Sequence, residues 1–466
     1  MRNIHLTSAV AWTLLLAGCA TPAPPPPLAT AAPPQWYAPL PHQGTLSDLS
    51  QWWQQFNDPL LVQLIESAQA LSPTVASARS RIEQARATRA AAGAALLPTL
   101  DAQASAVRGN SQPPAPLATT LQAGVQALWE IDLFGGNANA LRAAQSRLES
   151  AQAGWHDARV SVAAETAGSY VNLRTCERQL AVSVNDTQSR AETARLSDLT
   201  ARAGFTAPAT AALARAGAAA ASARSTQQRS QCEIELKTLV ALSGIPELRL
   251  RQQQETVWQE PAQPLLLPVL SLPAQLLAQR PDVYQAERDV ATASADIDST
   301  LAQRYPRLTL SGSIAAGLVH TGGANTDVQT WAIGPLAVTL PLFDGGRRAA
   351  NVEAAKARYD EAVALYTARV RQAVLEVELS LVSLESARLR MEDARTASEG
   401  FRASFAATEA RYRSGLGSLV ELEDARRTAL AAETTLVTLQ RERIAAWIAL
   451  YRAVGGGWTR PQAPSA

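Results

Sequence analysis

Leu133-Phe134-Gly135-Gly136 and Leu342-Phe343-Asp344-Gly345-Gly346 are two versions of one motif, and they indicate that this chain of 466 residues contains the same half twice. The segments before the two motifs correspond as well. Pro73, at the start of an alanine-rich helical stretch, has its counterpart in Pro281, 208 residues later. A repeat of this length indicates duplication of a whole supersecondary unit rather than a short-period solenoid.

Each half is predicted to contain a helix, two strands, a very long helix, a tight turn and a returning helix. The turn of the first half, Arg202-Ala203-Gly204, recurs as Arg413-Ser414-Gly415 at a separation of 211 residues, so the spacing hardly drifts. The sequence therefore predicts one repeat at residues 46–256, a linker at 257–272, a second repeat at 273–455 and a tail at 456–466.

The N-terminus has the layout of a secretory signal, with an apolar run from Ala9 to Leu16 and small residues behind it. Leu16-Ala17-Gly18-Cys19 resembles the bacterial lipoprotein signal. The resemblance implies that residues 1–18 are removed and that Cys19 carries a covalent lipid. Because Ala20 stands where Asp would favour retention in the inner membrane, it also implies the outer membrane. The alternative is a chance cysteine in an ordinary signal peptide.

A proline-rich spacer follows at residues 19–45, with nine prolines between Pro22 and Pro41. This composition favours an extended chain that separates the folded body from the lipid. After the signal, no segment has the roughly 18 consecutive apolar residues that a transmembrane helix needs. Any membrane-spanning part is therefore predicted to consist of strands.

The composition narrows the functional class. A net charge of +1 and a pI near 7.8 give no electrostatic reason to expect nucleic-acid binding. Hydrophobic residues make up 47% of the chain but aromatic residues only 5%, which suits closely packed helices. The histidines are isolated, so no metal site and no cofactor besides the lipid is expected. The sequence contains no P-loop, Gly-x-Ser-x-Gly or His-Glu-x-x-His motif that would indicate an enzyme.

Four segments alternate apolar and polar residues with period two. Such strands fit a wall between lipid and water, although a half-buried soluble sheet has the same pattern. If they face lipid, four strands leave two open edges, and unpaired backbone groups in hydrocarbon cost several kcal/mol each, so copies must share one barrel. The apolar positions are Leu100 to Ala106 (even numbers), Leu121 to Leu133 (odd), Leu308, Leu310 and Ile314, and Leu336, Val338, Leu340 and Leu342.

The helices after the strands are predicted to be unusually long. Residues 136–203 and 346–413 contain no proline, and their apolar residues recur at helical spacing. Each helix would therefore reach about 100 Å at 1.5 Å per residue. The returning helices, about 210–243 and 420–454, are half as long. The helices before the strands, about 59–95 and 273–303, supply the missing length if they stack end to end with the returning ones. An ordinary antiparallel coiled coil also explains this pattern. The pattern alone does not identify the space that the helices line.

Three segments resemble the signatures of the TolC-like outer-membrane factors, and most closely the lipid-anchored branch of NodT/OprM-type efflux channels. They are residues 276–283 (LLAQRPDV), 129–135 (WEIDLFG) and 340–346 (LPLFDGG). The family motif positions among them are Arg280, Pro281, Asp282, Phe134, Gly135, Gly136, Phe343, Gly345 and Gly346.

The resemblance implies a mixed α and β membrane protein. We expect a homotrimeric 12-stranded β-barrel, four strands per chain and two structural repeats per chain, continued by a long α-helical periplasmic tunnel. It also implies a periplasmic adaptor and an inner-membrane pump as partners, and passive conduction of drugs, toxic compounds or metal ions. The alternatives are an exit duct of type I protein secretion and a periplasmic coiled-coil scaffold lipoprotein.

The two turns resemble the hairpin tips that dock the adaptor in that family. Glycine permits the chain reversal, and Phe205 and Leu416 are apolar residues at a tip. Good turn chemistry without docking is the alternative. The candidate docking residues are Arg202, Gly204, Phe205, Tyr412, Arg413, Gly415 and Leu416.

Glu421 and Asp424 follow the second tip on one helical face, because residues three apart are neighbours on a helix. They fall where the family carries the acidic rings of its tunnel entrance, and three copies would bring six carboxylates to a constriction that favours cations. A solvated helix face is the alternative. In that family an Asp of the first tip can hold the gate closed through a contact with a basic residue of the second tip. Thr210 and Gly417 occupy the matching positions here, so the sequence gives no support for this closing contact.

Cys176 lies 28 residues before Gly204, and Cys232 lies 28 residues after it. An antiparallel hairpin therefore places them roughly opposite each other. Packed helices lie up to about 10 Å apart, which often exceeds what a disulfide spans, so a disulfide and two small buried core residues are both consistent with the spacing.

Overall fold

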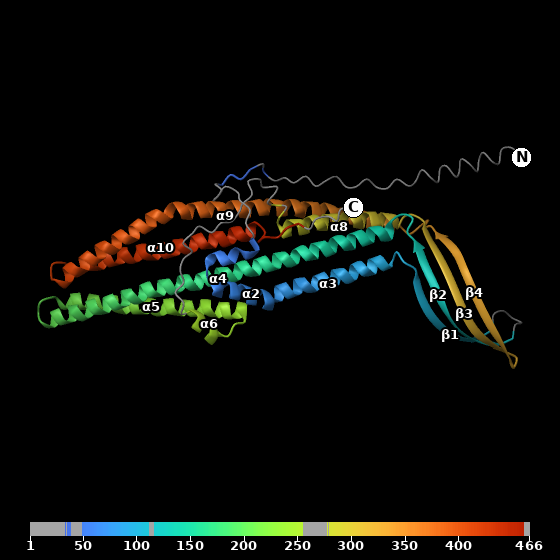
Figure 1. Ribbon diagram of the computed structural model, residues 1–466, viewed down its shortest axis with the longest axis horizontal. Helices are drawn as coiled ribbons and strands as arrows, with labels where there is room; N and C mark the ends of the chain where they lie inside the picture. The colour runs from blue at the N-terminus through green and yellow to red at the C-terminus, as the bar shows by residue number, and fades with distance from the viewer. Residues whose placement is uncertain are drawn as a thin grey trace. The chain divides into compact units, whose positions relative to one another are not determined.

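A computed structural model of the chain describes residues 33, 35–38, 49–110, 116–254, 277 and 279–460 (Figure 1). These residues form two compact units. One unit contains the described residues of 84–149 and 287–365, and the other contains those of 31–83, 150–286 and 366–466. The predicted combination of long helices with four strands is confirmed.

The first unit contains one four-stranded antiparallel sheet, in the order β1-β2-β3-β4. Its strands are β1 (Thr99–Gly109), β2 (Ala118–Ile131), β3 (Arg307–Thr321) and β4 (Ala324–Thr339). Each hairpin comes from one repeat, and the two repeats join where β2 pairs with β3. Within the described residues β1 and β4 are the edge strands of the sheet.

The strand register places those predicted apolar positions that lie within the four strands on one face. Leu100 pairs with Ala127, and Trp129 pairs with Leu310, which pairs in turn with Leu336. Directly opposed residues point to the same side of a sheet. The polar positions fall on the other face, as in the pair of Gln126 with Asp101. Since a slip of one residue would exchange the faces, the register itself supports the interpretation from sequence.

The fourth strand differs from its prediction. It begins at Ala324 and ends at Thr339, so Leu340 and Leu342 lie beyond it, just as Leu133 lies beyond β2. A register shift beside Leu310 inserts one extra residue into β4. The bulge changes the parity, and Trp331 and Ile333, 77% and 83% exposed, join Leu336 and Val338 on the apolar face. The apolar face of β4 is therefore longer than the sequence pattern indicates.

Two helices of 67 residues each follow the sheet hairpins, α4 (Gly136–Arg202) and α9 (Arg347–Arg413). Each returns through a tight turn into a shorter helix, α5 (Pro208–Ser243) or α10 (Leu419–Ala453). We refer to α4 with α5 as hairpin 1 and to α9 with α10 as hairpin 2. The remaining helical elements are η1 (Leu49–Phe56), α2 (Pro59–Leu71), α3 (Pro73–Ala94), α6 (Glu247–Gln254) and α8 (Pro281–Ala302).

The helices that precede the strands are shorter than predicted. Residues 59–95 form two helices, because Ser72 adopts an extended conformation and Pro73 starts a new helix. The residue before a proline is disfavoured in the helical region. In the second repeat α8 begins at Pro281, and Gln279 and Arg280 before it are not helical.

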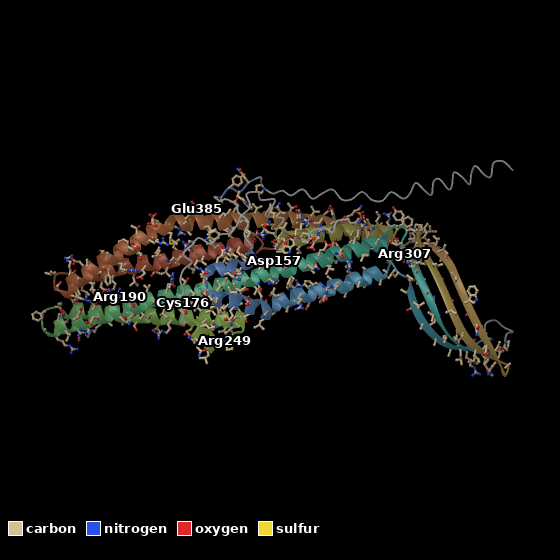
Figure 2. The ribbon with its side chains drawn as sticks, in the orientation of Figure 1. Asp157, Cys176, Arg190, Arg249, Arg307 and Glu385 are labelled. Atoms are coloured by element: carbon tan, nitrogen blue, oxygen red, sulfur yellow. A yellow bond between two sulfur atoms is a disulfide. The ribbon has the colours of Figure 1, made fainter. Side chains whose placement is uncertain are left out.

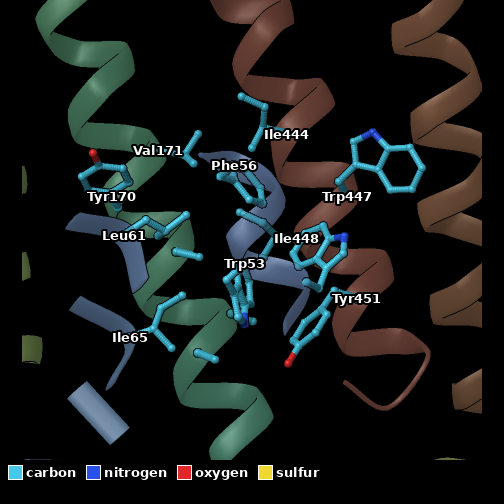
Figure 3. Close-up of a cluster of buried hydrophobic side chains, with 14 of the residues drawn as sticks. Trp53, Phe56, Leu61, Ile65, Tyr170, Val171, Ile444, Trp447, Ile448 and Tyr451 are labelled. Atoms are coloured by element: carbon cyan, nitrogen blue, oxygen red, sulfur yellow. The ribbon is translucent and has the colours of Figure 1, made fainter. Parts of the chain in front are cut away.

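The largest hydrophobic core lies in the second unit, where η1 and α2 pack among α4, α5, α9 and α10 (Figure 3). Aromatic side chains concentrate in it. The fully buried Trp52 stacks on Tyr451 with ring centroids 4.9 Å apart and meets Phe56 edge to face. Asp58 accepts a hydrogen bond from the buried Tyr170 and also caps α2. None of the described helices combines the length and apolar character needed to cross a membrane.

Candidate functional site

Both hairpins reverse through the same backbone motif. Gly204 and Gly415 adopt φ values of +78° and +75°, which glycine reaches without steric cost. In the first tip the Phe205 N–H donates to the carbonyl oxygen of Thr200 over 2.9 Å, and the Leu416 N–H makes the corresponding bond over 2.8 Å. Such a bond across the helix end is the Schellman arrangement. The turn chemistry expected from the sequence is therefore present in both repeats.

Large apolar side chains project from both tips. Phe205 is 84% exposed and Leu416 is 73% exposed. Val420 and Leu213, close to the tips on α10 and α5, are also exposed. Turn chemistry explains the glycines, but it does not require large apolar side chains beside them. Exposed apolar surface is unfavourable in water, and extended apolar patches are typical of a surface that meets a partner.

The other tip candidates each have a partner within the chain. The two arginines make helical ion pairs that leave their side chains mostly exposed, whereas the tyrosine hydroxyl connects the hairpins. The pairs are Arg202 with Asp198 at 2.5 Å, Arg413 with Glu409 at 3.2 Å, and Tyr412 with Ser197 at 3.0 Å.

Glu421 and Asp424 are exposed on the first turns of α10, and each has a local partner. Glu421 completes a capping box with Ser418, in which its carboxylate accepts from the Ser418 N–H at 3.2 Å. Asp424 forms an ion pair with Arg427. Both carboxylates line a groove of about 830 Å³ between α5 and α10. The sequence prediction of a shared face holds, but Arg427 offsets part of the negative charge.

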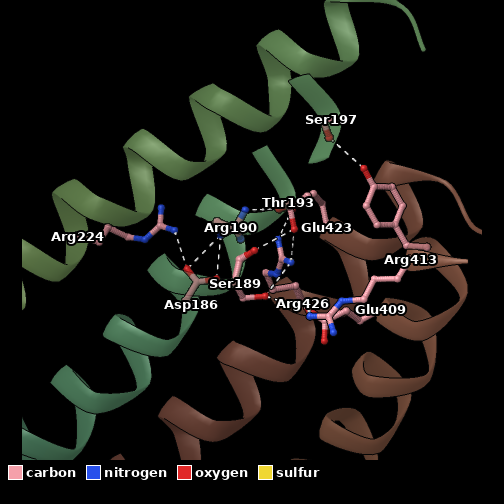
Figure 4. A network of polar contacts seen from close by, with 11 residues as sticks. Asp186, Ser189, Arg190, Thr193, Ser197, Arg224, Glu409, Arg413, Glu423 and Arg426 are labelled. Carbon is pink, nitrogen blue, oxygen red and sulfur yellow. Dashed lines mark hydrogen bonds and ion pairs between the residues drawn. The ribbon is translucent and has the colours of Figure 1, made fainter. Parts of the chain in front are cut away.

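Deeper between the hairpins, a cluster of charged and hydroxyl side chains joins α4 to α10 (Figure 4). We call it the polar cluster; it consists of Asp186, Ser189, Arg190, Thr193, Glu423 and Arg426. Arg190 donates to both oxygens of Asp186, at 2.9 and 3.1 Å, and forms an ion pair with Glu423. Since Glu423 also pairs with Arg426, one carboxylate from α10 connects two guanidinium groups.

Arg426 is 1% exposed and is the centre of the polar cluster. It donates to the hydroxyl oxygens of Ser189 and Thr193, each at 3.0 Å, and its guanidinium lies over the ring of Phe405. Burial lowers the pKa of Arg426, the charge of Glu423 raises it and that of Arg190 lowers it further. Separation of the hairpins would leave this buried charge without its partners, which is strongly unfavourable in free energy. The polar cluster therefore fixes the contact of the two hairpins.

Sequence patterns did not indicate the polar cluster. Its partners on α4 and α10 are 233 residues apart, and nothing local distinguishes Arg426 from the exposed Arg427 beside it. Thr210 and Gly417, the positions in doubt for a lock, have no place in it. The Thr210 N–H donates to the carbonyl oxygen of Ala207 at 2.9 Å.

Cys176 and Cys232 are joined in a disulfide, with a Cα–Cα distance of 5.4 Å (Figure 2). Of the two possibilities that the spacing allowed, the structure contains the bond. It connects α4 to α5 midway along hairpin 1. Hairpin 2 has the apolar residues Ala387, Met391 and Leu439 buried at a comparable level.

The motif residues Arg280, Pro281 and Asp282 form a buried junction of three helices. Arg280 is 5% exposed, donates to both carboxylate oxygens of Asp282 at 2.9 and 2.8 Å, and reaches Glu376 on α9 at 2.8 Å. It also donates to the carbonyl oxygen of Ala453 at the end of α10, at 2.7 Å. The planar guanidinium suits such a fork of acceptors.

Asp157 on α4 is a further carboxylate close to this junction. Burial raises the pKa of Asp157 and the charge of Asp282 raises it further, against the opposing charges of Arg452, Arg280 and Arg369. Burial also acts to raise the pKa of Asp282, but its hydrogen bonds and charge interaction with Arg280 outweigh that effect and lower it. The pKa values of the two carboxylates are therefore shifted in opposite directions.

The duplicated Leu-Phe motif starts the two long helices, but with different side-chain contacts. In the first repeat Phe134 stacks on Tyr305 with centroids 4.9 Å apart, whereas Phe343 is 93% exposed. Asp132 accepts from the backbone N–H of Ala138 at 2.7 Å to cap α4. Asp344 accepts from Gly346 and Arg348 to cap α9. The glycines Gly135, Gly345 and Gly346 have positive φ, and a side chain at Gly136 would crowd Ala302.

No group of side chains suited to a metal ion occurs among the described residues. The predicted lipidation site Cys19, the signal at residues 1–18 and the linker at 257–272 lie outside the described part of the chain.

Comparison with known proteins places the whole fold in one family. The sequence profile described as "Outer membrane efflux protein" matches residues 64–245 and 272–456. The chain is 29% identical over 471 residues to the pyoverdine export outer membrane protein OpmQ of Pseudomonas aeruginosa, covering 98% of this chain and 97% of that protein. It is 27% identical to nodulation protein T of Rhizobium leguminosarum bv. viciae, over 90% of this chain and 86% of that protein.

Among solved structures, the outer-membrane channel OprN superposes with a TM-score of 0.78 at 27% identity, over 93% of this chain and 99% of that chain. The CmeC outer membrane channel of Campylobacter jejuni superposes with a TM-score of 0.79 at 24% identity, over 91% and 92% of the two chains.

Proposed function

Because the chain belongs to the outer membrane efflux protein family, we propose that it is the outer-membrane channel subunit of a tripartite efflux system. It passively conducts small molecules, which are drugs, toxic compounds or metal ions, from an inner-membrane pump and a periplasmic adaptor to the outside. The register of the sheet carries this proposal, because it gathers the apolar positions of four strands on one face and leaves two edges to pair.

The functional assembly is a homotrimer. One sheet of four strands cannot close, and three copies supply 12 strands, which leave a channel where eight would nearly fill their interior. Identical sheets close a ring only if β4 of each copy pairs with β1 of the next, a head-to-tail interface. The apolar face then meets lipid, and the face with Gln126 and Ser313 lines the channel.

The hairpin tips dock the adaptor. Phe205 and Leu416 supply exposed apolar contacts on equivalent turns of the two repeats, so each trimer presents six related tips. Glu421 and Asp424 narrow the entrance with carboxylates that favour cations. Arg427 tempers this charge by pairing with Asp424. Cys19 carries the lipid that holds the mature N-terminus in the outer membrane.

Single-channel conductance in a planar bilayer tests the proposal. The purified mature protein is compared with the double variant Glu421→Ala/Asp424→Ala and with Glu392→Ala/Asp393→Ala, which removes two carboxylates farther along hairpin 2. We expect a small cation-selective conductance that loses selectivity only in the first variant. Absence of conductance from an intact oligomer would contradict the channel, and unchanged selectivity would contradict the acidic entrance alone.

A further inference from the structure

A cavity of about 480 Å³ lies in the second unit, where η1, α2, α4 and the end of α10 meet. Its volume falls within the range of roughly 300–1,000 Å³ that is typical of small-ligand sites. It is distinct from the groove at Glu421 and Asp424, and none of its lining residues belongs to the tips, the polar cluster or the family motifs. The proposed channel function therefore does not account for it.

Part of the cavity wall is aromatic. Trp53 of η1 meets Tyr451 of α10 edge to face, with ring centroids 4.7 Å apart (Figure 3). Trp458 reaches the cavity through a turn of glycines with positive φ that follows α10. A Cβ atom at Gly456 would lie 2.4 Å from a methyl group of Val160 on α4, so the turn fits against α4 only because Gly456 lacks a side chain. This aromatic wall suits an apolar group of a ligand.

The polar part of the wall contains a cation that α2 and α4 hold in place. Arg159 donates to the side-chain oxygen of Gln69 at 3.4 Å, and the Gln69 amide donates to the carbonyl oxygen of Arg159 at 2.9 Å. The half-buried guanidinium also lies 5.0 Å from the centre of the Trp155 ring. These contacts position the charge of Arg159 without neutralising it.

Glu66 lines the same cavity with the opposite charge. It precedes Gln69 by three residues on α2, which is about 4.5 Å along the helix at 1.5 Å per residue. Among the residues that the structure describes, neither Glu66 nor Arg159 takes part in an ion pair, whereas the buried Arg280 and Arg426 both do. The cavity therefore has one positive and one negative side chain a short distance apart, and neither has a countercharge.

The charges of the wall restrict the class of ligand. Burial lowers the pKa of His156 and the charge of Arg159 lowers it further, so the imidazole adds a hydrogen-bonding group that is neutral at pH 7. Glu66 would repel a ligand with only a negative charge, and Arg159 would repel one with only a positive charge. A ligand that carries both charges satisfies both side chains.

We propose that this cavity binds a short apolar peptide with free ends, about the size of a dipeptide. The peptide carboxylate pairs with Arg159, whose planar guanidinium can hold both oxygens. The peptide ammonium pairs with Glu66, which is exposed at the rim, and an apolar side chain lies against Trp53 and Tyr451. A dipeptide spans at most about 7 Å, which suits charges separated by about one helical turn. The site goes beyond the proposed channel function, which does not require it.

Isothermal titration calorimetry on the full-length protein in detergent tests the site, with L-leucyl-L-leucine as the ligand. We expect saturable binding of one dipeptide per chain. The N-acetylated dipeptide lacks the ammonium and the dipeptide amide lacks the carboxylate, so each should bind about 30-fold more weakly, because one charge of the wall loses its partner. Absence of saturable binding, or equal affinity for all three compounds, would overturn the proposal.

Two substitutions assign the charges. In Glu66→Gln the dipeptide and its N-acetylated form should bind alike, and in Arg159→Gln the dipeptide and its amide should bind alike. The matched controls are Glu399→Gln and Arg249→Gln, because both residues are exposed and neither lines the cavity. Both controls should keep the wild-type preference for the unblocked dipeptide. The same preference in Glu66→Gln and Arg159→Gln would contradict the assignment.

The design also covers loss of folding and failure of the channel. If Arg159→Gln does not fold, the blocked dipeptides on the wild type and the Glu66→Gln variant still decide the question. Conductance of the wild type tests the channel independently. A wild-type protein that conducts but does not bind the dipeptide overturns this site alone, and one that binds the dipeptide without conducting supports the site and contradicts the channel.

Discussion

Removal of the disulfide should loosen hairpin 1 and leave hairpin 2 unchanged. Cys176 and Cys232 are 56 residues apart, and the chain-entropy relation for a loop of that length gives about 4 kcal/mol of stabilisation. The closed loop contains the whole tip. The free energy therefore applies to the separation of α5 from α4, and the opening equilibrium should rise about a thousandfold when the bond is lost, at 1.4 kcal/mol for each factor of ten.

Amide hydrogen exchange measures this opening. In Cys176→Ala/Cys232→Ala, amides of α5 near Cys232 should exchange up to about a thousandfold faster than in the oxidised protein. Amides of α10 near Leu439, at the comparable level of hairpin 2, serve as the control within each sample. Wild-type protein reduced with a phosphine keeps the sulfur atoms in place, so it separates loss of the bond from loss of packing volume.

An increase of less than about tenfold in α5 of both the variant and the reduced protein would refute the reasoning, because packing alone would then hold the hairpin. Acceleration in the alanine variant alone would assign the effect to the small cavities that it creates. Equal acceleration in both hairpins would show that the loss is global rather than confined to hairpin 1.

Three further outcomes are expected. Arg280→Lys keeps the charge but not the fork to Asp282 and Ala453, so it should cost about 3 kcal/mol and lower the melting temperature, and an unchanged temperature would contradict the role of that junction. The pKa of Asp157 is raised by burial and by Asp282, so ionisation of this carboxyl disfavours the folded state once the pH rises above its unfolded pKa. Asp157→Asn should therefore raise the melting temperature at pH 7.5, and the gain should vanish as the pH falls towards the unfolded pKa near 3.9; an equal gain at both pH values would contradict this cause. Glu378 accepts from the backbone N–H groups of Tyr37 and Ala38 at 2.7 and 2.9 Å, so Glu378→Ala should speed their amide exchange more than Glu378→Gln does, and equal rates would mean that the carboxylate does not hold this segment.

The strands could be predicted because alternation is a local signal. Their faces followed from parity alone until the bulge in β4, where one extra residue put Ile333 and Leu336 on the same side. Such a bulge depends on the pairing with β3, which the sequence of β4 does not contain. The broken helix before β1 did have a local signal, since Pro73 disfavours a helical residue at Ser72.

The candidate site was predictable where its contacts are local. The spacing of Glu421 and Asp424 predicted a shared face, and Ser418 three residues before Glu421 is the sequence signature of the capping box that the structure contains. The polar cluster could not be found in this way, because Arg426 reaches Thr193 from the other repeat. Equal distances from Gly204 placed the cysteines opposite each other, but only their close approach of 5.4 Å decided for the bond.

The drift of the repeat spacing has a physical explanation in the strands. Thr99 and Arg307 begin equivalent strands, and their separation equals that of Pro73 and Pro281. The equivalent ends of α4 and α9 are separated by three residues more, so the change lies in the sheet hairpins and their junctions. The long helices are both 67 residues long.

The two kinds of element tolerate insertions differently. One residue inserted into a helix turns everything beyond it by about 100° and would take Arg426 or the cysteines out of their contacts. Residues added to a strand hairpin extend it, and a bulge restores the faces. Selection for matched levels at the two tips is therefore sufficient to keep helix length fixed while strand length drifts.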